Sequence, residues 1–146
     1  MADLNRRAHA EWRGGLRGGN GTITTSTGVL VEVPYSFGTR FENEPGTNPE
    51  ELLAAAHAAC FSMAFSADLE GAGYAPESVE TGATCTVSSQ PQGGWRITKM
   101  SLVTRAQVPG IDEETFQRIA QGAKEGCPVS NALAAIPEIT LEATLL

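Results

Sequence analysis

The first forty residues alternate in the manner of short strands and are rich in Gly, Thr and Val. Glycine pairs at positions 14–15 and 18–19 provide turns before the second segment. Residues 35–41 are ambiguous, because Pro34 and Gly38 interrupt the alternation, and they fit a loop or an irregular edge strand. We therefore expect a three-stranded antiparallel start, with strands at residues 8–12, 22–27 and 29–33.

The middle of the chain has the pattern of a long buried helix. Residues 47–50, Thr-Asn-Pro-Glu, have the spelling of a capping box, with Thr47 as the cap and Glu50 reaching back to the cap amide. From residue 52 to residue 69 the sequence is apolar on nearly all sides and rich in Ala. A helix of this kind needs a cover, which is either a sheet or a second subunit.

A hairpin is predicted after this helix. Residues 79–88 alternate as a strand, residues 90–94 form a turn, and residues 95–108 return. The apolar phase of the returning strand slips between Ile97 and Met100, which indicates a β-bulge there.

Two shorter helices and a last strand complete the chain. Acidic residues 112–114 suit the first turn of a helix that runs to Lys124 and stops at Gly126. Cys127 then stands at or next to the cap of a third, short helix that continues to Leu133. Residues 139–145 alternate cleanly as a strand. Without a repeat or a linker, the pattern predicts a single α+β domain over residues 1–146.

Composition narrows the class of protein. The chain has 41% hydrophobic and 18% charged residues, as soluble globular proteins do, and its net charge of −7 disfavours nucleic acid and anionic membranes as partners. No signal peptide is readable at the N-terminus, and the apolar stretch at residues 52–65 is too short to span a bilayer. We therefore expect a cytoplasmic protein without a transmembrane segment.

Three cysteines carry the candidate chemistry, and an odd number without an export signal argues for thiols rather than a disulfide framework. An ordinary thiol is only about 3% ionised at pH 7, so a reactive cysteine needs a helix N-terminus or a cation nearby. Cys127 has the predicted helix N-terminus. For Cys60, inside the apolar helix, an inert buried thiol is the default interpretation. The same interpretation fits Cys85 even better, because it lies in a strand without a nearby charge.

The residues alone leave several alternatives open. His57 and Cys60 lie at i and i+3 on one helix face, which permits a Cys–His dyad of a hydrolase or acyltransferase, although a lone buried histidine also fits a core position. A metal site would recruit His57, Cys60 and Cys127, but their spacing matches no metal motif and a fourth ligand is missing. Glu50 has a sufficient role as a capping carboxylate, and Arg40 fits a solvated side chain.

Three runs of the sequence resemble a known family. They are YSFGTRFE at residues 35–42, GTNPEELLAAAHAACFSMA at residues 46–64 and AKEGCPVS at residues 123–130. Together they look like the osmotically inducible protein C (OsmC) family of thiol peroxidases, and the resemblance covers essentially the whole chain. His57 and the position of Arg40 are more similar to the OsmC branch than to the related organic hydroperoxide resistance (Ohr) branch. In the Ohr branch the arginine comes near the N-terminus, where this chain has Arg13 and Arg17.

The resemblance implies a set of roles. Cys60 would be the peroxidatic nucleophile and Cys127 the resolving thiol, joined in a disulfide after oxidation, with Arg40 and Glu50 as electrostatic support. Cys85 matches no family motif. The implied fold is an intertwined homodimer whose antiparallel sheets enclose the central helices, with two sites at the interface.

The implied reaction needs neither metal nor cofactor. A thiolate attacks the peroxide and becomes a sulfenic acid, which condenses with the second thiol. The resemblance suggests a dithiol reductant of the dihydrolipoamide type. Organic hydroperoxides are the expected substrates if the apolar side chains of Phe37, Phe61, Met63 and Phe65 line the site, although these four fit a plain core as well.

Overall fold

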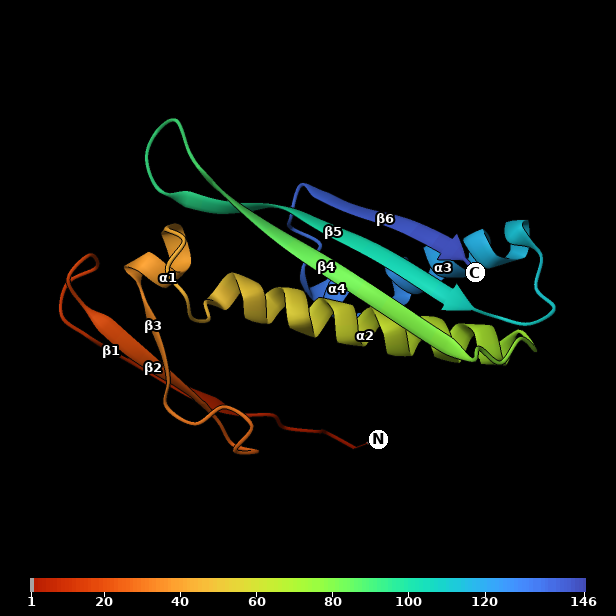
Figure 1. Cartoon of the computed structure of the whole chain (residues 1–146), viewed down its shortest axis with the longest axis horizontal. Coiled ribbons are helices and arrows are strands. Elements are labelled where there is room, and N and C mark those ends of the chain that lie inside the picture. The colour runs from red at the N-terminus through yellow and green to blue at the C-terminus, as the bar shows by residue number, and fades with distance from the viewer. Residues whose placement is uncertain (1) are drawn as a thin grey trace. The chain divides into compact units, whose positions relative to one another are not determined.

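The computed structural model describes residues 2–146 and has the predicted α+β fold (Figure 1). Its contacts divide the chain into two compact units, one reaching to Leu52 and the other formed by residues Leu53–Leu146. Each unit contains a three-stranded sheet. That residues 1–146 form a single folding domain stays a prediction.

The N-terminal sheet contains β1 (Ala8–Arg13), β2 (Asn20–Thr25) and β3 (Val33–Ser36), paired antiparallel in this order. The predicted strand at residues 29–33 is wrong: β3 begins only at Val33, and the side chain of Val29 is 82% exposed. The chain turns there because the backbone and hydroxyl of Thr25 bond the backbone of Leu30. Pro34 lies in β3, at the edge of the sheet, where a residue without an N–H is tolerated.

The ambiguous segment after β3 folds into a short helix, α1 (Phe37–Phe41). Ser36 and Thr39 form a reciprocal capping box, in which each side chain accepts a hydrogen bond from the other residue's backbone N–H. This box turns the chain sharply out of the strand and places Arg40 in the last turn of α1.

The long helix α2 (Pro49–Gly71) begins one residue later than its predicted cap implies. Its N-cap is Asn48: the side-chain Oδ1 accepts from the backbone N–H of Glu51 at 2.8 Å, and the Asn48 carbonyl accepts from Leu52. Thr47 instead donates its hydroxyl to the Glu51 carboxylate. The predicted capping role of Glu50 is therefore wrong, and its carboxylate is available for another partner.

With 23 residues, α2 is longer than the apolar stretch at residues 52–65 because its polar ends are helical too. By length and hydropathy alone the whole helix could cross a membrane, a test that the core helix of a soluble protein also passes. In the C-terminal unit, however, Phe61, Phe65 and Leu69 of α2 are buried in a protein core. Met63, on the same helix, is 76% exposed in the single chain.

The C-terminal sheet contains β4 (Ser78–Ser89), β5 (Trp95–Gln107) and β6 (Glu138–Leu145), side by side in this order (Figure 1). The predicted bulge is confirmed, since the register slips at Thr86 and Val87 and passes over Thr98. The pairing of β5 with β6 is parallel, so the expectation of antiparallel sheets is wrong for this pair. A parallel neighbour needs a crossover, which the two helices between these strands provide.

The helices α3 (Glu113–Gly126) and α4 (Pro128–Ala132), both predicted from the sequence, form this crossover. Asp112 caps α3 through the backbone N–H of Thr115. Alternate side chains of β5 pack against α2 and α3 to form the core. The fully buried large side chains of this core are Phe61, Phe65, Leu69, Met100, Leu102, Phe116 and Cys127.

Candidate active site

The two predicted redox cysteines meet in the C-terminal unit. Cys60 lies in the middle of α2, and Cys127 is at once the C-cap of α3 and the N-cap of α4. Pro128 forces this break, because the residue before a proline avoids helical dihedrals, and Cys127 has φ −58° and ψ 124°. Both thiols are reduced, and their sulfur atoms are 3.1 Å apart, within hydrogen-bond contact for sulfur.

The surroundings of the two thiols favour different protonation states. Burial, followed by the hydrogen bond to Cys127, raises the pKa of the Cys60 thiol. Burial also opposes ionisation of Cys127, but the backbone N–H of Ser130, the Cys60 thiol and the Ser130 hydroxyl outweigh it and lower the pKa of Cys127. When this coupled pair loses a proton, the charge is therefore favoured on Cys127 rather than on Cys60.

The first turn of α4 supplies the groups that stabilise this charge. The Cys127 side chain makes no capping hydrogen bond of standard geometry. The backbone N–H groups of Val129 and Ser130 thus act on the sulfur as nearby dipoles, at longer range than a cap bond. No charged side chain is among the groups that favour the thiolate of Cys60 within the described residues; the Val129 N–H alone acts in that direction.

His57 is buried beside this pair but is bonded to another residue. Its Nε2 lies 2.7 Å from Oγ of Ser130, and within residues 2–146 its Nδ1 has no hydrogen-bond partner. Burial lowers the pKa of His57, so the ring is neutral at physiological pH. Neither ring nitrogen contacts Cys60, and the Cys–His dyad considered above is not formed.

Arg40 and Glu50 form a tight ion pair in the N-terminal unit. Arg40 donates to the Glu50 carboxylate through Nε, at 3.0 and 3.2 Å, and through Nη2, at 2.7 Å. The carboxylate side chain of Glu50 is only 7% exposed, whereas that of Arg40 is 39% exposed. This two-point contact, a fork formed by Nε and Nη2, fixes the plane of the guanidinium. The third nitrogen, Nη1, takes no part in the contact with Glu50.

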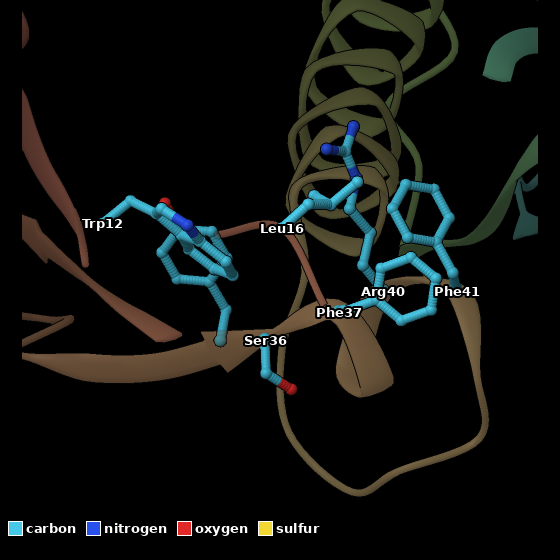
Figure 2. Close-up of a pocket in the computed structure, with 7 residues that line it drawn as sticks. Trp12, Leu16, Ser36, Phe37, Arg40 and Phe41 are labelled. Atoms are coloured by element: carbon cyan, nitrogen blue, oxygen red, sulfur yellow. The ribbon is translucent and has the colours of Figure 1, made fainter. Parts of the chain in front are cut away.

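An apolar pocket of about 230 Å³ adjoins Arg40 in the same unit (Figure 2). Phe37 and Phe41 extend from α1 with ring centroids 5.1 Å apart, and the Arg40 guanidinium lies 4.9 Å from the centre of the Phe41 ring. The pocket is lined by Trp12, Leu16, Tyr35, Ser36, Phe37, Arg40 and Phe41.

Of the four apolar side chains considered for a substrate site, Phe37 is the one that lines this pocket. Phe61 and Phe65 belong to the core of the C-terminal unit, and Met63 is exposed. Tyr35 and Phe41 stand in the same run of sequence as Arg40, whereas nothing in the sequence connected Trp12 and Leu16 with it.

The alternative arginines have other partners. Arg13 pairs with Glu11 at 2.7 Å on the exposed side of β1. The Arg17 guanidinium lies 4.5 Å from the centre of the Phe37 ring, near the pocket but outside the ion pair with Glu50. Within the N-terminal unit, Arg40 is therefore the arginine that Glu50 orients.

Sequence reasoning missed Ser130, whose hydroxyl is hydrogen-bonded to His57 and lowers the pKa of Cys127. Its position three residues after a helix cap is a signal, because a polar side chain there reaches back to the cap residue.

Among residues 2–146, no three His, Cys, Asp or Glu side chains gather as a metal would require. Cys85 lies in β4 opposite Met100 of β5.

Comparison with known proteins gives one family. The model of the OsmC-like protein family matches residues 41–142. The peroxiredoxin OsmC of Escherichia coli is 50% identical over 139 residues, which cover 95% of each chain. The organic hydroperoxide resistance protein OhrB of Bacillus subtilis is 32% identical over 127 residues, covering 86% of this chain and 91% of its own. A crystal structure of an organic hydroperoxide resistance protein from Elizabethkingia anophelis superposes with a TM-score of 0.68 at 28% identity, covering 99% and 98% of the two chains.

Proposed function

The chain belongs to the OsmC-like protein family, and we propose that it reduces organic hydroperoxides through a sulfenic acid on Cys60 and a disulfide between Cys60 and Cys127. It is a cysteine-based peroxidase with a peroxide-detoxifying redox role, in keeping with the peroxiredoxin and organic hydroperoxide resistance proteins that it resembles. Stress defence is the corresponding role in the cell.

The contact of 3.1 Å between the sulfur atoms of Cys60 and Cys127 carries the proposal. A disulfide bond is about 2.05 Å long, so the two atoms need approach by only about 1 Å to bond. A sulfenic acid formed on Cys60 therefore has its resolving thiol in contact from the start. A thiol used for hydrolysis or acyl transfer would need no such partner.

The first chemical step consumes the peroxide. The Cys60 thiolate attacks one peroxide oxygen, the O–O bond breaks, and the sulfur is oxidised to a sulfenic acid while the peroxide is reduced. The leaving alkoxide takes a proton from the Cys127 thiol and becomes an alcohol. For this step a cation must favour ionisation of Cys60 over that of Cys127, since the surroundings of the reduced pair favour the opposite order.

The second step closes the disulfide. The Cys127 thiolate attacks the sulfur of the Cys60 sulfenic acid, a sulfur–sulfur bond forms, and the S–OH bond breaks. The departing hydroxide takes up a proton from solvent and becomes water. A dithiol reductant of the lipoyl type then restores both thiols. Its first thiol forms a mixed disulfide with one cysteine, and its second thiol attacks that disulfide and releases the cysteine as a thiol.

The guanidinium of Arg40 is the cation for the first step. Its charge favours the thiolate, and its N–H groups can donate to the peroxide oxygens as negative charge develops. Glu50 holds it in one orientation through the two-point contact. A lysine has no such fork and would not be held in the same way.

We assign this cation to a partner subunit. Helix α2 is continuous from Pro49 to Gly71, and the ten residues between Glu50 and Cys60 correspond to about 15 Å along its axis. A guanidinium held at Glu50 is therefore too distant for the Cys60 of its own helix. In a homodimer the Arg40–Glu50 pair of one chain would serve the Cys60 of the other.

The substrate class follows from the pocket beside Arg40. Its lining is mostly aromatic and aliphatic, and its volume is about 230 Å³. Such a pocket suits the organic group of an organic hydroperoxide better than the second OH group of hydrogen peroxide. Hydrogen peroxide would react at the same thiolate without gaining this apolar contact, so it should be reduced less well.

We place the enzyme in the cytoplasm as a soluble homodimer. The buried side of α2 packs against protein in the C-terminal unit, as in the core helix of a soluble protein. The reducing cytoplasm also suits a catalytic disulfide that must be opened after each turnover.

Turnover coupled to a dithiol tests the proposal. A panel of organic hydroperoxides and hydrogen peroxide would be measured with the wild type and with Cys60→Ser, Cys127→Ser and Cys85→Ser. Cys60→Ser should abolish peroxide consumption, whereas Cys127→Ser should allow one oxidation and then stall or over-oxidise Cys60. Cys85→Ser is the matched control and should turn over as the wild type.

Peptide mapping of the oxidised wild type completes the test. The proposal requires a Cys60–Cys127 bridge within one chain. A bridge that contains Cys85, bonds only between chains, or equal single-turnover rates in the wild type and Cys60→Ser would each contradict it.

A further inference from the structure

His57 is a fully buried polar residue that the proposed reaction does not use. Its Nε2 is 2.7 Å from the Ser130 hydroxyl, and its Nδ1 has no partner within residues 2–146. A buried polar atom without a partner lowers the free energy of unfolding. An apolar side chain would fill the same space without this cost, so packing alone does not explain an imidazole here. Its one hydrogen bond is therefore the feature to explain.

Ser130 connects His57 to the resolving thiol. It is the third residue of α4 after the cap Cys127, and from this position a side chain reaches back toward the cap residue. The Ser130 hydroxyl stabilises the charge on Cys127, and the Cys127 sulfur is 3.1 Å from that of Cys60. Ser130 is thus bonded to His57 and lowers the pKa of Cys127, which is itself in contact with Cys60.

The direction of the hydrogen bonds follows from counting protons. A serine hydroxyl has one proton, and Ser130 stabilises the Cys127 thiolate only if that proton points to the sulfur. The Ser130 oxygen must then accept a hydrogen bond from Nε2–H of His57. A neutral imidazole has one N–H, so Nδ1 is an unprotonated acceptor, which is less costly to leave unpaired in a core than a buried N–H.

We propose that His57 is a positioning residue that acts through the Ser130 hydroxyl to hold Cys127 as a thiolate for its attack on the Cys60 sulfenic acid. Once Cys60 is oxidised, its S–H no longer stabilises Cys127, and Ser130 is the side chain that still does. The attack forms the sulfur–sulfur bond and expels hydroxide, which is protonated by solvent. This inference rests on the proposed function for its chemical step.

The protonation of Cys127 can be measured without any peroxide. The β-carbon chemical shift of Cys127 would be followed by NMR across pH in the reduced protein. Cys60 is the one titratable group among those that shift the Cys127 pKa in the described chain, and no other titratable group is among the causes for His57. Ser130→Ala should raise the Cys127 pKa by about one unit, a tenfold loss of thiolate below that pH.

Two substitutions at His57 separate its hydrogen bond from its bulk. The amide nitrogen of glutamine in His57→Gln extends to the place of Nε2, and this variant should titrate as the wild type. The shorter side chain in His57→Asn reaches only the place of Nδ1, and the Cys127 pKa should rise as in Ser130→Ala. Both variants are polar and smaller than histidine, so circular dichroism and thermal unfolding provide the check on folding.

Single-turnover kinetics locate the step that is affected. In Ser130→Ala and His57→Asn, oxidation of Cys60 should not slow, because a higher Cys127 pKa favours ionisation of Cys60 within the pair, while disulfide formation slows about tenfold. The double variant should be no slower than Ser130→Ala alone, because His57 acts through Ser130. His57→Gln should restore disulfide formation to near the wild-type rate.

Three outcomes would overturn the inference: a wild-type titration of Cys127 in His57→Asn, an equal slowing of both steps, or additive effects in the double variant. The two proposals fail separately. If the wild type did not reduce peroxides, the proposed function would fall, but the titration of Cys127 would still decide whether His57 acts on it.

Discussion

The Arg40–Glu50 pair and the Cys60–Cys127 pair are built in opposite ways. The ion pair is complete in the single chain, with three short hydrogen bonds and a carboxylate that is almost fully buried. The two thiols are 3.1 Å apart, and their surroundings favour ionisation of Cys127 over that of Cys60, the proposed nucleophile. The Arg40 guanidinium is already oriented to bind an anion, whereas Cys60 still needs a cation that favours its thiolate.

This difference suggests a division of labour. A guanidinium fixed in advance spends no energy on reorganisation when charge develops on a peroxide. Two thiols in contact titrate as a coupled pair, so a nearby cation changes which of the two sulfur atoms ionises first. A reduced chain would then keep Cys60 protonated until the rigid pair is brought to it.

Breaking the rigid pair should have the largest effect. Arg40→Lys keeps the charge but loses the fork, and we expect kcat/KM for an organic hydroperoxide to fall about 10²- to 10³-fold. Without the oriented cation the Cys60 thiolate is less favoured, so its pKa rises and the pH profile of Cys60 alkylation moves to higher pH. Stopped-flow turnover and alkylation rates across pH measure both effects.

Glu50→Gln is the companion variant, because it leaves Arg40 in place but weakens its orientation. Its loss of kcat/KM should be smaller than that of Arg40→Lys, while Arg13→Lys, at an exposed position, should behave as the wild type. Wild-type activity in Arg40→Lys would show that the fork does not matter for catalysis.

Mixing inactive chains tests whether the two pairs come from different subunits. Cys60→Ser homodimers lack the nucleophile and Arg40→Ala homodimers lack the cation, so each alone should be inactive. A heterodimer of the two would combine the intact Cys60 of one chain with the intact Arg40 of the other and recover about half of wild-type activity. Turnover after co-refolding, with heterodimers quantified by native mass spectrometry, gives the result. Confirmed heterodimers without activity would place the whole site within one chain.

The fold was predictable wherever a local signal decided it. Asp112 and Pro128 marked the starts of α3 and α4, and the phase slip in residues 97–100 marked the bulge. The parallel neighbour of β5 was not readable, because strand direction depends on where the crossover helices pack. The Val-rich residues 29–33 looked like a strand but turn in solvent, since hydrogen bonds from Thr25 outweigh their strand propensity.

The site was predictable only through its motifs. Cys60, Cys127, Arg40 and Glu50 were named from their resemblance to a family, whereas the residues alone allowed inert thiols and a capping glutamate. The bond between His57 and Ser130 joins positions 73 apart in the chain, and no local pattern encodes such a contact. The pocket likewise gathers side chains from β1, β3 and α1.

The pocket beside the rigid pair should set selectivity rather than rate. Phe37→Ala removes an aromatic wall next to Arg40, and KM for a bulky organic hydroperoxide should rise about tenfold while that for hydrogen peroxide stays the same. Val29→Ala, at an exposed apolar position outside the pocket, is the matched control and should alter neither KM. A parallel rise for both peroxides in Phe37→Ala would assign the ring to general folding instead of substrate binding.

The start of α2 offers the smallest effect, and it tests why Glu50 is available to Arg40. Asn48 caps the helix through the backbone N–H of Glu51, so Asn48→Ala should lower the free energy of unfolding by about 1 kcal/mol. Thr47→Ala loses only an exposed hydrogen bond to a carboxylate and should cost no more than a few tenths of a kcal/mol. Urea unfolding at one fixed protein concentration measures both, since dimerisation would otherwise change the apparent stability. The reverse order would restore Thr47 as the cap and return Glu50 to the capping box predicted from the sequence.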